Sequence, residues 1–246
     1  MITPDMPMTE GLVYVYNHAT GPLPSYDRYW RVPDMVWALD SDGRFSIELA
    51  AGDYYIGAIK RNGPPQIGPP MGGDLFLLSS DDAGMPKKVA VASGKKIDMG
   101  IISGTRTAPG QPLPQGITSV TGVVQNHAGS PIEGMLVLAF RSPRVIGKPL
   151  FVSERSGKDG RFLLRVNQGG TYYLKLRDSY GGGPPKTGET LDGNREEPMV
   201  PVLVATGENL GDVVLKGKTF PGRGRTKEKI AEKKLEPTKK NELKPQ

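Results

Sequence analysis

The feature that most constrains the fold is a set of short motifs that occur twice, in the same order, along the 246 residues. Self-similarity of this kind indicates two copies of one supersecondary unit. The paired motifs are Asp42-Gly43-Arg44-Phe45 with Asp159-Gly160-Arg161-Phe162, Gly52-Asp53-Tyr54-Tyr55 with Gly170-Thr171-Tyr172-Tyr173, Gly63-Pro64-Pro65 with Gly183-Pro184-Pro185, Val91-Ala92-Ser93-Gly94 with Val204-Ala205-Thr206-Gly207, and Asn17-His18-Ala19 with Asn126-His127-Ala128. The last pair follows apolar segments that open with Gly11-Leu12-Val13 and Gly122-Val123-Val124.

The repeated motifs have the pattern of strands and tight turns. Apolar and polar residues alternate over residues 45–49 and 162–166, as in a strand with one buried face. The Asp-Gly ahead of each run supplies the positive φ of a hairpin turn. In residues 172–177, Tyr172, Leu174 and Leu176 share one face. We therefore expect strands in both copies.

The chain contains 33 Gly and 23 Pro, which divide it into short segments rather than long helices. The predicted fold class is all-β, with two tandem Ig-like, prealbumin-like antiparallel β-sandwiches. We expect a first sandwich over 1–104, a Pro-rich linker over 105–116, a second sandwich over 117–217 and a flexible basic tail over 218–246.

The second copy resembles the carboxypeptidase regulatory-like module, which is similar in shape to B-type repeats of bacterial surface proteins. The residues that carry the resemblance are Gly122-Val123-Val124, Gly129-Ser130-Pro131-Ile132-Glu133-Gly134, Met135-Leu136-Val137-Leu138-Ala139 and the two later motifs at 159–162 and 170–173. The first copy departs from this pattern over 26–37. The resemblance implies a prealbumin-like sandwich and an accessory, adhesive or spacer role outside the cytoplasm. It also implies, as one alternative, a haem-free subunit that accompanies a multihaem cytochrome.

Charge is concentrated at the C-terminal end. The chain has a net charge of +6, and residues 216–246 hold eleven Lys or Arg against four Glu, which leaves the body close to neutral. Glutamates interrupt the basic residues of the tail and no aromatic residue follows Phe220. We therefore expect no specific nucleic-acid partner.

Several classes of site are excluded or unsupported. The absence of cysteine rules out disulfides and thiolate ligands in this chain. No apolar run is long enough for a transmembrane helix, and residues 1–7 do not resemble a signal peptide. We expect a periplasmic or cell-surface protein whose signal peptide has been removed, although a cytosolic protein fits the same residues.

The two histidines, His18 and His127, occupy matching places in the repeat. They could be ligands offered to a metal or haem of a partner. The alternative, which we favour, is an Asn-His-Ala turn in which the imidazole has no such role. No second His, Cys or carboxylate pair accompanies either residue, so we expect no metal and no cofactor.

The paired Gly-Pro-Pro loops are a candidate contact site, because loops carry function while strands carry the fold. The residues are Gly63, Pro64, Pro65, Tyr180, Gly183, Pro184 and Pro185. Residues 181–187 resemble a P-loop, but Pro184 and Pro185 have no N–H for a phosphate.

A second candidate is the aromatic set Tyr14, Tyr16, Trp30 and Trp37, together with Tyr26 and Tyr29. These side chains could stack on sugars or anchor a protein interface. The alternative is that they cover the open side of a small core.

Acidic pairs such as Asp81-Asp82 match solvated turns, and no catalytic motif is present. The sequence thus predicts a non-enzymatic binding or spacer protein, with a carbohydrate-binding module and the cytochrome-associated subunit as alternatives.

Overall fold

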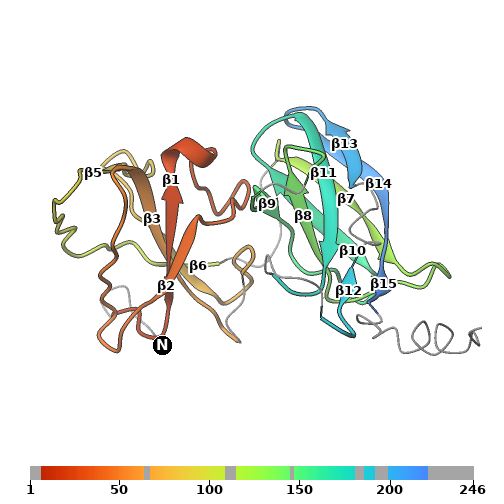
Figure 1. Cartoon of the computed structure of the whole chain (residues 1–246), viewed down its shortest axis with the longest axis horizontal. Coiled ribbons are helices and arrows are strands. Elements are labelled where there is room, and N and C mark those ends of the chain that lie inside the picture. Colours follow the sequence, from red (N-terminus) through yellow and green to blue (C-terminus); the bar gives the residue numbers. More distant parts are fainter. Residues whose placement is uncertain are drawn as a thin grey trace, which may run out of the picture.

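The computed structural model describes residues 7–63, 67–108, 115–144, 147–180, 186–191 and 199–220. Within these ranges the chain is almost entirely β-structure, and one short 3-10 helix, η1 (His18–Thr20), accompanies fifteen strands. Figure 1 shows the strands gathered into two bodies along the longest axis of the molecule. The predicted all-β class with tandem sandwiches is confirmed. No helix in the described ranges has the length and hydropathy needed to cross a membrane.

The first sandwich is built on one six-stranded sheet. Its strand order is β2-β1-β3-β4-β6, and β5 pairs with the other part of β3. All of its ladders are antiparallel. The strands are β1 (Leu12–Asn17), β2 (Met35–Ala38), β3 (Gly52–Lys60), β4 (Leu75–Leu78), β5 (Val89–Val91) and β6 (Arg106–Thr107).

The opposite layer of the first sandwich is formed by two segments that are not strands. Phe45, Ile47 and Leu49 are half-buried and alternate with exposed residues, as the sequence predicts, but they join no ladder. They pack with Met99 and Ile102 on a cluster centred on Val13, Val15, Tyr54 and Ile56. The prediction of a hydrogen-bonded strand over 45–49 is therefore wrong, whereas the predicted alternation of buried and exposed residues is confirmed.

The second sandwich has two sheets. A three-stranded sheet has the order β10-β7-β14, and a six-stranded sheet has the order β15-β12-β11-β8-β9 with β13 paired to β11. One ladder, β7 with β14, is parallel, whereas the prediction was antiparallel throughout. The strands are β7 (Thr118–Gln125), β8 (Leu136–Phe140), β9 (Phe151–Val152), β10 (Arg161–Val166), β11 (Gly170–Arg177), β12 (Thr190–Leu191), β13 (Val200–Val204), β14 (Asn209–Lys216) and β15 (Lys218–Thr219).

The predicted inward faces of the second sandwich are confirmed. Phe162, Leu164 and Val166 on β10 are buried, and so are Tyr172, Leu174 and Leu176 on β11. All six side chains belong to the core between the two sheets. Alternation at period 2 is sufficient to assign these faces because a residue shift of one would expose the whole set.

The sheet edges reach beyond the segment limits that the sequence suggests. Arg106 and Thr107 form β6 inside the stretch predicted as a linker, and Ala108 is buried. Residues 109–114 lie outside the described part. Lys218 and Thr219 form β15 at the start of the predicted tail, and the tail from 221 onward also lies outside it.

The register of pairing shows which strands of the two sandwiches correspond. Gly52 of β3 pairs with Val91 of β5, and Gly170 of β11 pairs with Val204 of β13. The hydroxyl of Tyr54 donates to the carbonyl of Ala50, four residues upstream, and that of Tyr172 donates to the carbonyl of Gln168 at the same spacing. The repeat is therefore structural over these motifs.

The upstream motif pair is aligned differently from the sequence interpretation. Tyr16 of β1 faces Tyr55 of β3, while Phe140 of β8 faces Tyr173 of β11, so β1 corresponds to β8 and not to β7. Pro7 to Leu12 accordingly matches Pro131 to Leu136, and the positive φ of Glu10 matches that of Gly134. His18 follows β1, whereas His127 follows β7. The predicted equivalence of the two histidines is wrong.

A close backbone approach at Gly122 leads to a first prediction. A Cβ built on Gly122 would lie 1.8 Å from the carbonyl oxygen of Val213, at the irregularity in the β7–β14 ladder. Gly122→Ala should lower the free energy of unfolding by about 1–3 kcal/mol, because the added methyl forces the strands apart. Urea denaturation measures this change. Gly211→Ala is the matched control, since its nearest atom would lie at 3.9 Å, and an equal loss in both variants would contradict the explanation.

Candidate functional site

The aromatic residues that the sequence singles out lie mostly inside the molecule. Tyr14 and Tyr16 have no exposed surface and Trp30 is 1% exposed, whereas Trp37 on β2 is 38% exposed. Buried rings cannot stack on a ligand from solvent. The predicted aromatic binding face is therefore corrected at Tyr14, Tyr16 and Trp30, and the alternative, that these rings cover a core, holds.

The core that these rings cover is shared by both sandwiches. Tyr14, Tyr16 and Trp30 belong to one buried cluster with residues of β8 and β9 from the second sandwich, and Trp30 meets Tyr14 edge to face at 6.0 Å. The members contributed by the second sandwich are Leu136, Leu138, Phe140, Val152 and Met199. We call this cluster the junction core.

The junction core brings corresponding strands together. Val13 and Val15 of β1 face the core of the first sandwich, so Tyr14 and Tyr16 emerge on the other face. On β8, Val137 and Ala139 face the second core, and Leu138 and Phe140 emerge toward the junction. Both strands are buried on both faces. An unbroken apolar run such as residues 136–140 is the sequence signal for this arrangement.

A buried arginine next to the junction core holds the segment 17–34 together. The guanidinium of Arg31 is fully buried and donates to the carbonyls of Pro22 and Asn17, each at 2.6 Å. It also donates to Asp34 Oδ2 at 2.7 Å and stands over the ring of Tyr16, 5.5 Å from its centre. Charge-assisted bonds of this kind are stronger than neutral ones.

The same segment is bound directly to the second sandwich. Lys148 Nζ lies 2.9 Å from Asp34 Oδ1 and donates to the carbonyl of Val32 at 2.7 Å. The backbone N–H of Val32 donates to Leu150 at 3.0 Å, and Arg31 forms a β-bridge with Phe151. No sequence motif identifies Arg31, Asp34 or Lys148, because Lys148 lies more than 100 positions from the other two.

Asp34 gives the junction a dependence on pH. Burial acts to raise the pKa of Asp34, but hydrogen bonds from Lys148 and Thr20 outweigh it, so the pKa is lowered from 3.8. The stabilisation is present above the unfolded pKa and is lost as pH falls through the folded pKa. We expect the unfolding free energy of the wild type to drop below about pH 4 more steeply than that of Asp34→Asn. Denaturant titrations at several pH values measure this slope. Asp82→Asn, at an exposed position, should retain the wild-type slope, and an Asp34→Asn slope as steep as that of the wild type would refute the assignment.

The Gly-Pro-Pro loop of the first sandwich is anchored by a buried ion pair. Arg61 Nη1 lies 2.7 Å from Asp74 Oδ2, with each side chain 5% exposed, and Asp74 Oδ1 accepts from the N–H of Asn62 at 2.8 Å. Gly63 is exposed, and Pro64 and Pro65 lie outside the described residues. Arg61 and Asn62, which lead into the loop, are therefore held in place by Asp74.

A similar ion pair lies next to the corresponding loop of the second sandwich. Arg177 Nη2 lies 2.6 Å from Glu189 Oε1, and the N–H of Lys186 donates to Glu189 Oε2 at 2.8 Å. Tyr180 is half-buried against the junction core, and burial raises its pKa to about 12. Gly183, Pro184 and Pro185 lie outside the described residues. Neither ion pair is visible as a sequence motif.

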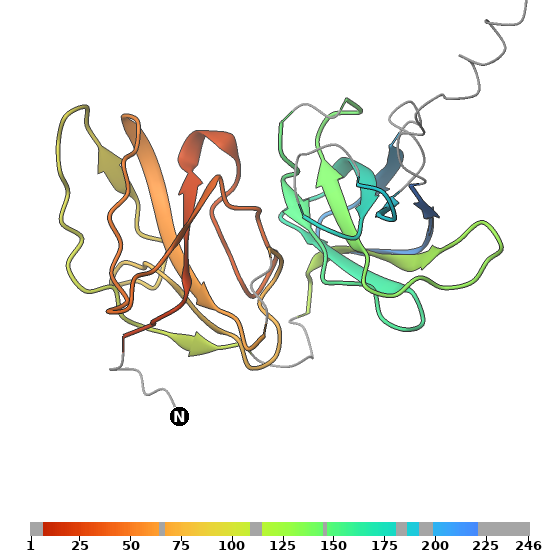
Figure 2. The same cartoon turned by 60° about the horizontal axis from the view of Figure 1, so that its bottom comes forward.

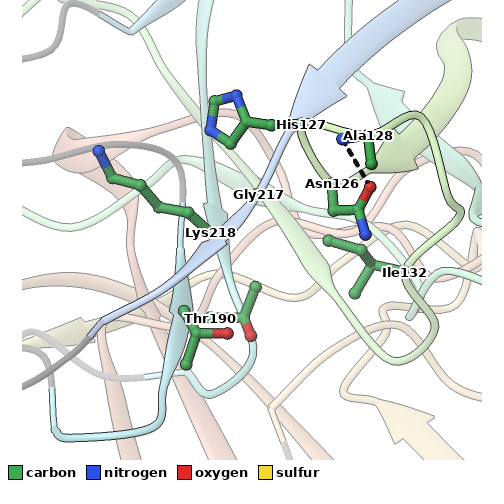
Figure 3. A pocket seen from close by; sticks show the side chains of 8 residues that line it. Asn126, His127, Ala128, Ile132, Thr190, Gly217 and Lys218 are labelled. Atoms are coloured by element: carbon green, nitrogen blue, oxygen red, sulfur yellow. Dashed lines mark hydrogen bonds between the residues drawn. The ribbon is translucent and has the colours of Figure 1, made fainter.

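The two histidines have different surroundings. The Nδ1 atom of His18 lies 3.0 Å from the hydroxyl of Tyr55. His127 lines an open pocket of about 470 Å³ between the β7–β8 turn and β15, with Asn126, Ile132, Thr190 and Lys218 (Figure 3). Figure 3 shows the imidazole of His127 and the amine of Lys218 among the side chains that line it. Among the described residues, no three His, Asp or Glu side chains group as a metal site.

Three solved structures align with most of the chain at low similarity. A Streptococcal ancillary pilin is 16% identical over 86% of this chain and 57% of its own, with a TM-score of 0.26. The Bacillus anthracis TIE protein is 9% identical over 85% of this chain and 34% of its own, with a TM-score of 0.28. Shaft pilin spaA from Lactobacillus rhamnosus GG is 12% identical over 89% of this chain and 94% of its own, with a TM-score of 0.26. The chain thus spans 57% and 34% of the first two proteins. TM-scores of this size do not establish a shared function.

No protein-family model and no curated protein matches the chain.

Proposed function

We propose that this chain is a non-enzymatic, extracytoplasmic structural module that acts as a stiff two-sandwich spacer and as a platform for a protein partner. The observation that carries the proposal is the junction core, which places buried side chains of both sandwiches in one cluster. A spacer transmits position only when its units keep a fixed relative orientation, and a shared apolar core provides that constraint.

Polar contacts support the same conclusion. Lys148 binds Asp34 and Val32 across the junction, and Arg165 donates to the carbonyl of Asp27 at 3.1 Å. Directional bonds at several points around an apolar centre define the rotation of one sandwich relative to the other. Interfaces between domains that lack these features permit hinge motion.

A distance measurement tests the spacer. Because the chain has no cysteine, Asp82→Cys and Lys158→Cys introduce two unique labelling sites at exposed positions, one on each sandwich. Pulsed electron–electron double resonance on the doubly spin-labelled chain should give one narrow distribution of the distance between the two labels. A broad or multimodal distribution would refute the spacer, and the same pair on a Trp30→Ala background shows whether the junction core is the cause.

The resemblance to regulatory-like modules supports the extracytoplasmic location and suggests a surface filament or a multihaem-cytochrome assembly as the class of partner. Crosslinking in the native surface fraction, followed by identification of the linked peptides, tests this part. A linked peptide from a filament subunit or a cytochrome is expected, and recovery of the chain from the cytosol alone would contradict it.

A further inference from the structure

One edge of the first sandwich exposes an uninterrupted apolar strand. β2 ends its sheet and, within the described part of the chain, pairs only with β1. Its residues are Met35, Val36, Trp37 and Ala38, and the last three are exposed, with Val36 and Trp37 each at 38%. Successive residues of a strand point to opposite faces, so β2 exposes apolar side chains on both faces. An apolar strand at a sheet edge is a template for another strand.

The other strands that end a described sheet, or that have one partner in it, lack this character. Each carries a charge, contains a proline, exposes a single small residue or is covered by another segment. Arg106 lies on β6, Arg161 on β10, Lys216 on β14, Lys218 on β15 and Pro201 in β13, while β5 exposes only Ala90 and β9 forms a bridge with Arg31. Charges, prolines and covering segments are the means by which proteins prevent edge-to-edge pairing. Among the described strands, β2 has none of them.

The equivalent edge of the second sandwich is covered by main chain from the first. β9 pairs with β8 as β2 pairs with β1, and β1 corresponds to β8. At this edge Arg31 forms a β-bridge with Phe151, and the N–H of Val32 donates to the carbonyl of Leu150 at 3.0 Å. Figures 1 and 2 show the loop between β1 and β2 on the side of the first body that faces the second. A strand segment from a sandwich of the same kind therefore fits this edge of the fold.

The backbone of β2 presents hydrogen-bonding groups at its outer edge. The N–H of Leu39 donates to the carbonyl of Gly11 at 2.8 Å, toward β1. N–H and C=O groups of successive strand residues point to alternate sides of the strand. Those of Val36 and Ala38 therefore point away from β1, toward an incoming strand.

We propose that two copies of the chain associate through β2, as antiparallel strands related by a two-fold axis at Trp37. In this register Val36 of one copy faces Ala38 of the other, and each such pair exchanges both of its main-chain hydrogen bonds. Trp37 faces its own equivalent at a non-hydrogen-bonded position, where side chains of opposite strands lie closest and aromatic pairs are favourable. Met35 faces Leu39, so the paired residues bring no charge into the contact.

The ends of β2 limit the length of the new ladder. Pro33 has no N–H to donate. Asp40 Oδ1 accepts from the N–H groups of Asp42 and Arg44, at 2.9 and 2.7 Å, which holds the chain in a turn. Stable interfaces bury about 1,200–2,000 Å², more than a ladder of this length provides, so we expect a weak, concentration-dependent dimer.

The symmetry of the contact fixes what it can build. Both copies use the same surface, and such an isologous contact closes after two copies instead of continuing as a filament. The contact thus joins two spacers at their first sandwiches. It goes beyond the proposed function, which concerns the fixed relation of the two sandwiches within one chain.

Sedimentation and fluorescence measurements on the full chain test the proposal. At physiological ionic strength, where repulsion between the basic tails is screened, the mass by sedimentation equilibrium should rise from monomer to dimer as the concentration increases. The chain has two tryptophans and Trp30 is 1% exposed, so quenching by iodide reports on Trp37. Quenching should therefore fall over the same range of concentration.

Two pairs of variants locate the contact. Trp37→Lys places like charges opposite each other and should weaken dimerisation about tenfold or more. Leu203→Lys adds the same charge at a position on β13 that is 72% exposed and should dimerise as the wild type does. Ala38→Pro removes an outward N–H, which an edge strand tolerates, and should also weaken the dimer, whereas Ala38→Ser keeps this group and should not. Circular dichroism and the melting temperature establish that each variant is folded.

Three results would overturn the proposal: a monomer at every concentration, a dimer that Trp37→Lys and Ala38→Pro leave intact, and equal weakening by Trp37→Lys and Leu203→Lys. The spin-label experiment, run with the labelled chain diluted in unlabelled chain, reports the distance within one molecule. A narrow distribution together with a monomeric chain would remove the β2 contact and leave the spacer in place.

Discussion

Replacing Trp30 by alanine should lower the free energy of unfolding by about 3–5 kcal/mol, the usual cost of deleting a large buried aromatic side chain. Trp30 is 1% exposed and contacts Tyr14 edge to face within the junction core. The size of the loss reflects both the apolar surface returned to water and the cavity left between two bodies that cannot collapse freely.

The same substitution should change the form of the unfolding transition. The junction core couples the sandwiches, so the wild type should unfold in one transition, and Trp30→Ala should separate it into two. Differential scanning calorimetry and urea denaturation measure both effects. Trp37→Ala is the matched control, because Trp37 is 38% exposed on β2 and its loss should cost less than about 1 kcal/mol. Equal losses for the two tryptophans would contradict the placement of Trp30.

Replacing Arg31 by alanine should lower the free energy of unfolding by about 3–5 kcal/mol, and the cause is electrostatic. The change removes the donor shared by Asp34 and the carbonyls of Pro22 and Asn17 and leaves these groups buried with fewer partners. Removing one member of a buried ion pair is costly because the remaining charge keeps its desolvation penalty. The pair itself is weaker evidence for stability than the loss on breaking it suggests.

Arg161→Ala tests whether the loss in Arg31→Ala comes from the burial of the ion pair rather than from the charge alone. Arg161 also faces a carboxylate, Asp159, at 3.4 Å, but its side chain is 80% exposed. Exposed pairs contribute about 0–1 kcal/mol, so this variant should unfold close to the wild type. Chemical denaturation of both variants gives the comparison, and an Arg31→Ala loss below about 1 kcal/mol would show that solvent reaches the Asp34 carboxylate.

Trp30 and Arg31 are adjacent in the chain but stabilise the fold by different interactions. Trp30 stabilises by apolar burial, whereas Arg31 donates to buried carbonyls and to the Asp34 carboxylate, which would keep fewer partners without it. Because the side chains are adjacent and share the junction, their effects should not add in the double variant. A coupling energy from the double-mutant cycle would show that the apolar and polar parts act together.

Local patterns predicted much of the second sandwich. The alternation in residues 162–166 assigned the inner face of β10, and Asp159-Gly160 marked the turn before it, because both depend only on strand periodicity and on the φ that glycine tolerates. The same pattern over 45–49 assigned the buried side correctly but could not reveal that no strand lies beside it. Pairing depends on a neighbour that the segment does not encode.

The candidate site was less accessible to sequence reasoning. Alternation along β1 places Tyr14 and Tyr16 on the opposite face from Val13 and Val15, but whether that face is exposed depends on what packs against it. The apolar runs of β1 and β8 carried a usable signal, since continuous apolar residues indicate strands buried on both faces. Nothing local connects Lys148 to Asp34.

The sequence by itself determined the class of fold, the strand faces and the turns, because these follow from residue periodicity and backbone conformation over a few residues. Tertiary structure alone decided the rest: that corresponding strands β1 and β8 bury their outer faces in one junction, that His18 and His127 are not equivalent, and that residues 45–49 pack on the core without joining a ladder. These features arise from contacts between distant segments, and their free energy depends on which surfaces exclude water together.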